Sequence, residues 1–285
     1  SGINGQDGAY LADKLIKKDY KVFGILRRAS TQSIERLKYK KIDKKIEYIR
    51  CDLTEFQTIA KYIKDIRPHY FYNLGAQSFV QYSFENPFNT FKINSEAVLN
   101  ILETLRRENI NCKFYQASTS EMFGNTNTNK KGLIDLNSKF NPCSPYAISK
   151  LSAHQLVKTY REAYKIYACS GILFNHESPL RGREFVTKKI IENLVNQKIN
   201  NGDILRLGNL NSKRDWGHAD DYVNAMIKMM TMPKADDYII STGKAYSIRE
   251  FFLKVAYKLG FNPKLIGRGR NEYCIDKNSN KKIMI

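Results

Sequence analysis

Two side chains that can transfer a proton together lie near the middle of the chain. Tyr146 and Lys150 are four residues apart, a spacing that places both on one face of a helix. A free tyrosine has a pKa of about 10 and is a poor base at neutral pH. A neighbouring ammonium group favours the phenolate and lowers that pKa. The pair therefore predicts a tyrosine that acts as a general base.

A second group of candidate catalytic residues, Thr119 and Glu121, follows a strand expected over residues 113–118. In an open parallel sheet, ligands bind outside the carboxyl ends of the strands. Glu121 could instead only stabilise the first turn of a helix, but its place beside Thr119 favours a catalytic role. Because Tyr-x-x-x-Lys occurs in any amphipathic helix, it gains weight only together with this group and a glycine loop.

The glycine loop opens the sequence. Gly2, Gly5 and Gly8 are three residues apart, and an amphipathic helix is expected directly after them, over residues 9–18. Glycines let the backbone approach a pyrophosphate, whose charge is attracted by the helix N-terminus. The alternative is an ordinary turn between a strand and a helix.

The residues after the next expected strand, 21–26, predict which dinucleotide binds. Arg27 and Arg28 stand at its end. An acidic residue at this place selects NAD, whereas an arginine accommodates the 2′-phosphate of NADP. We therefore predict NADP as the cofactor; the alternative is a solvated arginine pair.

Two later strands also end in residues suited to a cofactor site. Asp52 and Leu53 follow a strand expected over 46–51. The Asp52 carboxylate can accept from an adenine amino group, cap the following helix, or do both. A strand expected over 70–74 runs into the small residues Gly75–Ser78, where a cofactor could lie close to the backbone.

The order of elements predicts an α/β fold. Strands alternate with helices expected over 87–108 and 146–164, and a strand over 167–174 follows. We expect a Rossmann-like, doubly wound parallel sheet over residues 1–175 and a smaller α/β substrate lobe over 176–285. In that lobe we expect helices over 185–196, 220–232 and 247–259, strands over 205–208 and 237–241, and a polar loop over 213–218.

The strand that usually precedes such a glycine loop is not in the sequence. In a doubly wound sheet that strand is central. Without it, the sheet would have a slot with unpaired backbone groups on both sides. We therefore expect the sequence to be part of a longer chain, and residues 281–285 to begin a further strand.

Composition narrows the class of protein. The 285 residues carry a formal charge of +19, but the lysines are scattered, which favours a solvated surface over a nucleic-acid-binding site. No apolar run is long enough to span a membrane. The five cysteines form no pair with metal-ligand spacing, which favours reduced thiols in a cytoplasm and no metal site.

Together these stretches resemble the extended short-chain dehydrogenase/reductase family and, within it, the GDP-mannose 4,6-dehydratases. The resemblance covers nearly the whole sequence. It rests on GINGQD at residues 2–7, NLGAQS at 73–78, YQASTSE at 115–121, SPY at 144–146, GILFNHESP at 171–179 and RDWGH at 214–218.

The resemblance implies an NADP-dependent dehydration of a GDP-sugar for deoxysugar synthesis. Tyr146, assisted by Lys150, would remove the hydroxyl proton at carbon 4 while NADP+ takes the hydride, and Thr119 would hydrogen-bond the carbon-4 oxygen. Glu121 would take the carbon-5 proton and assist loss of water from carbon 6, before hydride returns to that carbon. Ser120 fits the GDP-mannose group, since the dTDP-glucose enzymes have an Asp-Glu pair after the threonine. The implied cofactor residues are Gly2, Asn4, Gly5, Gln6, Asp7, Arg27, Arg28, Asp52, Leu53, Leu74, Gly75, Ala76, Ser78, His176 and Arg181.

The implied contacts to the nucleotide sugar are Asn175, Lys189 and Arg214, and the implied assembly is a homo-oligomer, a dimer or tetramer. Leu180 stands where the family usually has an arginine. Two other functions stay open: the same chemistry on another GDP-sugar, such as a GDP-manno-heptose, and a non-catalytic protein that binds NADP or a nucleotide sugar.

Overall fold

The computed structural model describes residues 1–27, 33–126, 128–129, 132–200 and 202–285. They form two compact units, Ser1–Ser178 with Gly217–Ser241, and Pro179–Trp216 with Thr242–Ile285. This division differs from the single boundary at residue 176 that we expect from the sequence. Residues 217–241 belong to the first unit because their helix α9 (Ala219–Met229) packs on α1 (Gln6–Ile16), and their strand β8 (Asp237–Ile240) pairs with β5 (Ala168–Leu173).

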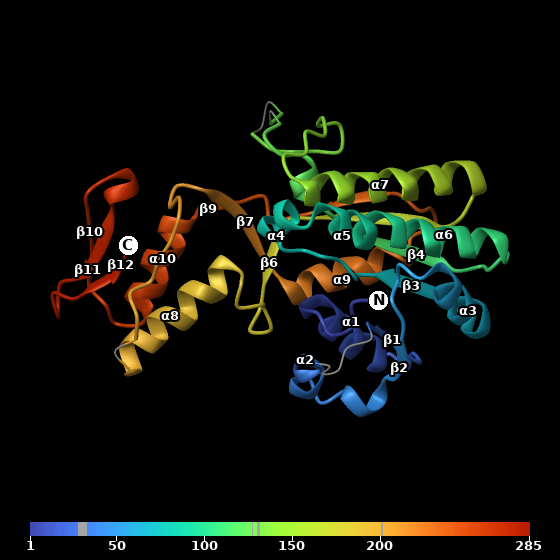
Figure 1. Ribbon diagram of the computed structural model, residues 1–285, viewed down its shortest axis with the longest axis horizontal. Coiled ribbons are helices and arrows are strands. Elements are labelled where there is room, and N and C mark those ends of the chain that lie inside the picture. The colour runs from blue at the N-terminus through green and yellow to red at the C-terminus, as the bar shows by residue number, and fades with distance from the viewer. Residues whose placement is uncertain (28–32, 127, 130–131, 201) are drawn as a thin grey trace. The chain divides into compact units, whose positions relative to one another are not determined.

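The first unit is built on parallel strands, which confirms the predicted α/β fold. Strands β3 (Tyr70–Asn73), β4 (Lys113–Thr119), β5 and β8 form one sheet in that order, and β1 (Phe23–Leu26) pairs with β2 (Glu47–Arg50) separately. Helices α3 (Phe56–Ile66), α6 (Ala97–Arg107) and α7 (Pro145–Tyr164) lie on one face, and α1 and α9 on the other (Figure 1). The shorter elements are α2 (Glu35–Tyr39), η1 (Asp43–Lys45), α4 (Val80–Glu85), η3 (Ser120–Met122) and β6 (Asn175–Glu177).

The spacing of apolar residues explains why these helices cover the sheet. Ile59 and Ile63 of α3 are four residues apart and buried, as are Ile101 and Leu105 of α6. Both pairs belong to one apolar cluster with Phe114 of β4. Apolar side chains at this spacing form the buried stripe of an amphipathic helix.

The helix expected over residues 87–108 contains an irregular turn. The segment starts as α5 (Pro87–Phe91), passes through a π-helical turn, η2 (Lys92–Glu96), and continues as α6. A π turn inserts one residue into an α-helix, and such turns are frequent at functional sites. The sequence shows helical periodicity on both sides and therefore does not reveal the break.

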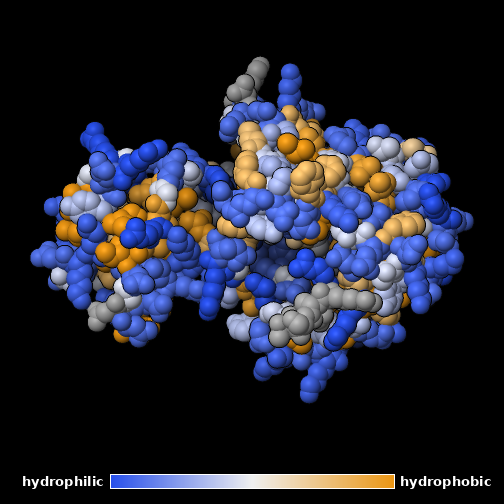
Figure 2. All heavy atoms as spheres, in the orientation of Figure 1, coloured by the Kyte–Doolittle hydropathy of each residue, from blue (hydrophilic) through white to orange (hydrophobic). Residues whose placement is uncertain are grey.

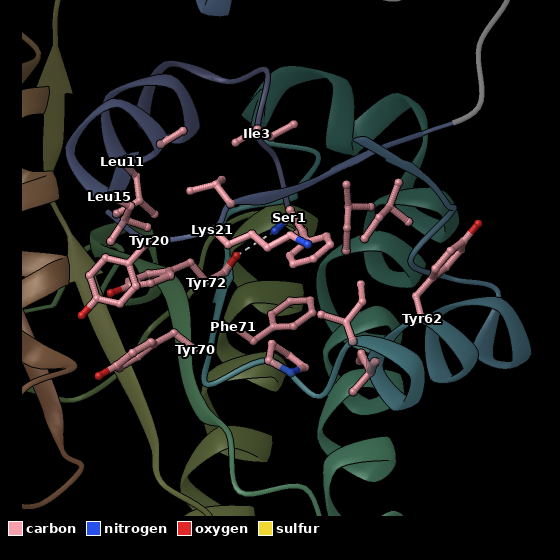
Figure 3. Close-up of a pocket in the computed structure, with 18 of the residues that line it drawn as sticks. Ser1, Ile3, Leu11, Leu15, Tyr20, Lys21, Tyr62, Tyr70, Phe71 and Tyr72 are labelled. Atoms are coloured by element: carbon pink, nitrogen blue, oxygen red, sulfur yellow. Dashed lines mark hydrogen bonds between the residues drawn. The ribbon is translucent and has the colours of Figure 1, made fainter. Parts of the chain in front are cut away.

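The predicted slot in the sheet is present. Among the described strands, β1 pairs only with β2, and β3 pairs only with β4. An apolar cavity of about 450 Å³ lies between β1 and β3 (Figure 3), lined by Leu11 and Leu15 of α1, Phe23, Ile63 and Phe71, among others. The amino group of Ser1 donates to the Tyr72 carbonyl over 2.8 Å at its edge. A strand ending at Ser1 would therefore run along β3 and occupy this space.

The second unit packs two helices against a small antiparallel sheet. Helices α8 (Val186–Asn200) and α10 (Ile248–Lys258) share an apolar core with β10 (Pro263–Ile266), β11 (Tyr273–Asp276) and β12 (Lys282–Met284). A 3-10 turn, η4 (Gly269–Asn271), precedes β11. Ser247 caps α10 in a full capping box with Glu250. The strand expected over 281–285 is β12.

Two expectations for the second unit are wrong. Residues 213–218, expected as a polar loop, form β7 (Lys213–His218), whose start pairs with β9 (Ala245–Ser247). Its residues are only partly buried or exposed, so the alternating apolar pattern of a strand is missing. Residues 205–208, expected as a strand, contribute only a single bridge from Leu205 to Met284.

No helix among the described residues is long and apolar enough to cross a membrane. The five cysteines lie within the described part of the chain and form no disulfide there; Cys143 is exposed and the other four are buried.

Filling the slot should stabilise the first unit. We expect that a strand of about five valine and isoleucine residues, fused in front of Ser1, raises the free energy of unfolding by about 2–5 kcal/mol, because it buries apolar side chains and pairs both open strand edges. Urea unfolding measures the gain. An extension of equal length made of glycine and serine is the control, and equal stability of the two fusions would contradict the assignment.

Candidate active site

The glycine loop is shaped by close contact with the end of β3. Gly2 has φ +67°, and a Cβ there would lie 2.7 Å from the Leu74 carbonyl carbon. A Cβ on Gly8 would lie 2.2 Å from the Gly2 oxygen. Only glycine fits these positions. The loop and residues 74–75, both predicted to contact a cofactor, are thus brought together.

The N-terminus of α1 is open to a ligand on its first turn. Its N-cap is Gly5, which offers no side-chain hydrogen bond to the first turn. The exposed N–H groups of such a turn and the helix dipole favour an anion. The Asn4 side-chain amide donates to the Ser33 carbonyl over 3.3 Å, so this residue also holds the segment after β1.

Gln6 and Asp7 contact β6. Gln6 Nε2 donates to the His176 carbonyl over 3.1 Å, and Ser178 Oγ donates to Gln6 Oε1 over 2.8 Å. His176 Nε2 lies 2.8 Å from Asp7 Oδ2, and its ring stacks on Tyr222 with centroids 4.4 Å apart. These residues tie the glycine loop to β6. Their predicted contacts with a cofactor stay predictions.

The ends of β1 and β2 carry the residues predicted to choose the cofactor. Arg27 follows β1 and is exposed, whereas Arg28 lies outside the described residues. Asp52 Oδ1 accepts from the Thr54 backbone N–H over 3.0 Å and from its hydroxyl over 2.8 Å. The expectation that Asp52 caps the following helix is wrong: the N-cap of α3 is Glu55, and the Asp52 carboxylate forms a turn with Thr54 instead. Leu53 contacts the next segment, since a Cβ on Gly75 would lie 2.9 Å from its Cδ1.

Asn94, in the π turn, is a positioning residue that the sequence does not reveal. It is 1% exposed. Its Oδ1 accepts from the Gln77 N–H over 2.9 Å, and its Nδ2 donates to the Gln77 carbonyl and to Ser149 Oγ over 3.0 and 3.1 Å. It therefore fixes the segment that contains the predicted cofactor residues Ala76 and Ser78 against α7. A buried asparagine inside an apolar helix pattern is the signal that could have revealed it.

The predicted catalytic residues of β4 lie at the end of that strand. Thr119 is its last residue and caps η3, because its Oγ1 accepts from the Glu121 N–H over 3.2 Å. Glu121 is half-buried, and its carboxylate has no hydrogen-bond partner among the residues that the structure describes. A carboxylate in this state is available to a substrate.

Helix α7 presents Tyr146 and Lys150 on its buried face. Ser144 caps the helix through a 3.1 Å bond from the Ala147 N–H. Tyr146 is 8% exposed and Lys150 is 3% exposed. Lys150 Nζ donates to the Ala117 carbonyl over 2.9 Å. Burial lowers the pKa of Lys150 to about 8, so at neutral pH the ammonium form predominates next to Tyr146.

The Ala117 carbonyl is also held from the other side. Gln116 Nε2 donates to it over 3.1 Å, and Gln116 Oε1 accepts from Asn73 Nδ2 over 2.8 Å. Both Gln116 and Asn73 are 1% exposed. They were not identified from the sequence, although polar residues in otherwise buried strands are a usable signal. Helix α7 packs on β4 and η3, so the four predicted catalytic residues come from adjoining elements.

Three predicted residues lie in the second unit. Lys189 of α8 donates from Nζ to the Arg206 carbonyl over 2.7 Å. Arg214 of β7 is exposed, and the guanidinium of Arg181 lies over the Phe185 ring at 3.4 Å. Asn175, by contrast, begins β6 in the first unit. Within the described residues no cluster of three or more His, Cys, Asp or Glu side chains could hold a metal ion.

Solved structures with a similar fold include nucleotide-sugar enzymes. A UDP-glucose 4-epimerase from Thermus thermophilus, solved with NAD, has a TM-score of 0.80 and 20% identity, over 99% of this chain and 87% of that one. A dTDP-glucose 4,6-dehydratase from Streptomyces venezuelae, solved with NAD and TYD, has a TM-score of 0.80 and 19% identity, over 91% of this chain and 80% of that one. At this identity the likeness shows the fold.

Curated sequences are much more similar. A GDP-mannose 4,6 dehydratase of Drosophila melanogaster is 44% identical over 269 residues, which cover 90% of this chain and 66% of that protein. A GDP-mannose 4,6-dehydratase of Yersinia enterocolitica is 40% identical over 279 residues, 95% of this chain and 74% of that protein. This chain therefore spans about two thirds to three quarters of these relatives. The family profile described as GDP-mannose 4,6 dehydratase matches residues 1–285, and the chain belongs to this family.

Proposed function

We propose that the chain is an NADP-dependent dehydratase that converts GDP-mannose to GDP-4-dehydro-6-deoxymannose. The observation that carries the proposal is the contact from Lys150 to the Ala117 carbonyl. It holds the face of α7 that contains Tyr146 against the strand that ends in Thr119. The tyrosine that serves as base for the oxidation and the glutamate of the elimination, Glu121, thus come from neighbouring elements, as this reaction requires. Membership of the family supports the choice of substrate.

The glycine loop fits a dinucleotide. Side chains at Gly2 or Gly8 would collide with the backbone, and the first turn of α1 has no side-chain cap, so N–H groups remain for a diphosphate. We infer NADP rather than NAD from Arg27, a basic residue at the end of β1. When bound, NADP would supply the hydride chemistry of the reaction at carbons 4 and 6. Gly75, Ala76, Leu53 and Asp52 would border the rest of the cofactor.

Tyr146 removes the proton of the carbon-4 hydroxyl in the first step. The ammonium of Lys150 on the same helix face stabilises the phenolate that this requires. Thr119 donates its hydroxyl hydrogen to the carbon-4 oxygen and orients it. Oxidation comes first, because only a neighbouring ketone makes the carbon-5 proton acidic enough for a carboxylate.

Glu121 then carries out the elimination. Its carboxylate takes the proton from carbon 5 and passes a proton to the carbon-6 hydroxyl, which leaves as water. Carbon 5 needs a proton again after the hydride return, and the proton that Tyr146 took from the carbon-4 hydroxyl balances the reaction. One group can serve as base and acid in turn because the two carbons are adjacent. Asn175, Lys189 and Arg214 would bind the GDP-sugar, with Arg214 suited to a bidentate phosphate contact.

We further infer a homo-oligomer in the cytoplasm. The cysteines, which form no disulfide among the described residues, support a reducing compartment. Large apolar side chains are exposed on neighbouring helices: Phe84 of α4 is 56% exposed, Phe88 of α5 is 89% exposed and Ile148 of α7 is 50% exposed. Figure 2 shows apolar side chains exposed over the part of the first unit formed by α4 to α7. Such a surface is typical of an interface between identical subunits.

The substitution Glu121→Gln tests the reaction. Incubation with NADP+ and GDP-mannose should yield a product lighter by one water, seen by mass spectrometry, and Glu121→Gln should lower turnover at least about 100-fold, because the amide cannot take the carbon-5 proton. Glu162→Gln, at the exposed end of α7, is the control and should keep activity. Turnover of a GDP-manno-heptose but not of GDP-mannose would show that the heptose is the substrate. No turnover of either, even in a chain extended at both ends, would contradict the proposal.

Lys150→Met should remove activity and increase the free energy of unfolding. The pKa of Lys150 falls from 10.5 to about 8 on burial, so the cost of burying the ammonium is fully present below about pH 8 and disappears as pH rises toward 10.5. The variant should abolish turnover. Its free energy of unfolding should rise by up to about 3 kcal/mol at pH 7, and by less at pH 10. In the variant, Gln116 still donates a hydrogen bond to the Ala117 carbonyl. Urea unfolding at both pH values checks this, with Lys158→Met on the exposed face as control; an equal gain at both pH values would exclude the ammonium as its source.

Phe88→Asp should weaken self-association. A charge on this 89% exposed ring would have to be buried in a subunit interface, which costs several kcal/mol, but it costs a monomer little. Light scattering during size-exclusion chromatography reports the mass. Tyr257→Asp, an exposed aromatic of α10, serves as the matched control, and an unchanged mass of Phe88→Asp would move the interface elsewhere.

A further inference from the structure

A buried histidine on α7 contacts the strand that carries the catalytic residues. His154 lies one helical turn beyond Lys150 and two beyond Tyr146 on the same face, and it is 3% exposed. Its Nδ1 lies 3.3 Å from Ser118 Oγ. Ser118 stands between Ala117, which accepts from Lys150, and Thr119. Two consecutive residues of β4 are thus bound by two consecutive turns of α7.

The other side of the His154 ring faces a strong ion pair. Its Nε2 lies 3.7 Å from Asp237 Oδ2, at the start of β8. Both oxygens of Asp237 accept from Arg161 over 2.9 Å. The ring therefore lies between β8 and β4. Asp237 fixes its position on one side, and Ser118 contacts its Nδ1 on the other.

Ring packing links His154 to the segment after Glu121. Phe140 meets the imidazole edge to face, with centroids 5.5 Å apart, and stacks on Phe123 at 5.1 Å. Phe123 follows η3 directly and is fully buried. Movement of the imidazole would disturb both the strand with Thr119 and the turn with Glu121.

We propose that His154 is a positioning residue of the dehydratase, which sets the distance between the Tyr146–Lys150 face of α7 and the Thr119–Glu121 end of β4 through its bond to Ser118. This rests on the proposed function. The bond is short-range, buried and specific to one ring nitrogen, so its loss should displace Thr119 without unfolding the sheet. Displacements of well under 1 Å at reacting groups are enough to slow a reaction about tenfold.

His154 acts as a neutral group. Burial lowers its pKa; Arg161 and Lys158 on its own helix also lower it, and Asp237 of β8 opposes them. Because the Asp237 carboxylate is already paired with Arg161, it does not hold a proton on the imidazole, which is uncharged at neutral pH. A neutral ring can make the one directed bond to Ser118 without placing a second cation beside Lys150.

A double-mutant cycle tests the proposal. His154→Phe keeps the ring contact with Phe140 and removes the nitrogen, and Ser118→Ala removes the partner without adding volume. Each should lower kcat about tenfold with KM changed less than about twofold, and the double variant should lose no more than either single one. His154→Asn, whose amide replaces Nδ1, should recover most of kcat. Tyr160→Phe, which removes a partly buried α7 bond to Glu103, is the control and should keep kcat.

Some results would overturn the proposal. If the two losses multiply, or if all variants lower only the unfolding temperature, His154 has a structural role alone. Nitrogen NMR of the chain, which has four histidines, gives a readout without turnover: Ser118→Ala should shift the Nδ1 resonance that His154→Phe identifies. An unchanged resonance would show that the bond is absent and would overturn the proposal. An inactive wild type with a shifted resonance would count against the proposed function instead.

Discussion

A buried ammonium bound to one carbonyl organises the first unit. Lys150 is 3% exposed and donates to the Ala117 oxygen over 2.9 Å. Burying a cation costs free energy unless it is hydrogen-bonded. The sheet and α7 can therefore approach only in the register that supplies this acceptor. That register holds the face of α7 that carries Tyr146 against β4, so a requirement of charge burial also positions the proposed catalytic residues.

Other buried polar groups repeat this logic around the site. Asn94 joins the segment after β3 to α7, and Gln116 joins β3 to the Ala117 carbonyl through Asn73. Each is satisfied in one arrangement and would be orphaned in others. Apolar packing alone tolerates small sliding movements of helices on a sheet, whereas these directed bonds do not. Precision at the site therefore comes from polar residues in the core.

The sequence predicts what depends on local pattern. The helix with Tyr146 and Lys150, the glycine loop and the slot between β1 and β3 follow from spacing, backbone sterics and the missing pairing partner. Contacts between distant segments leave no such pattern, so the bond of Asp7 to His176 and the identity of the partners that Asn94 binds could not be predicted. Strand β7 was missed for a related reason: most of its residues are polar, and its pairing with distant strands such as β9 makes it a strand.

The π turn at residues 92–96 has a consequence for how this chain can change. An extra residue rotates the helix by about 100°, so the exposed aromatic face of α5 and the buried face of α6 are out of phase by that amount. No substitution can restore a straight α-helix without turning one of these faces away from its neighbours. Deletion of a single residue would remove the π turn and would rotate one of these faces away from its neighbours. Along this segment, variation by insertion or deletion should therefore be far more damaging than variation by replacement, whatever the residues exchanged.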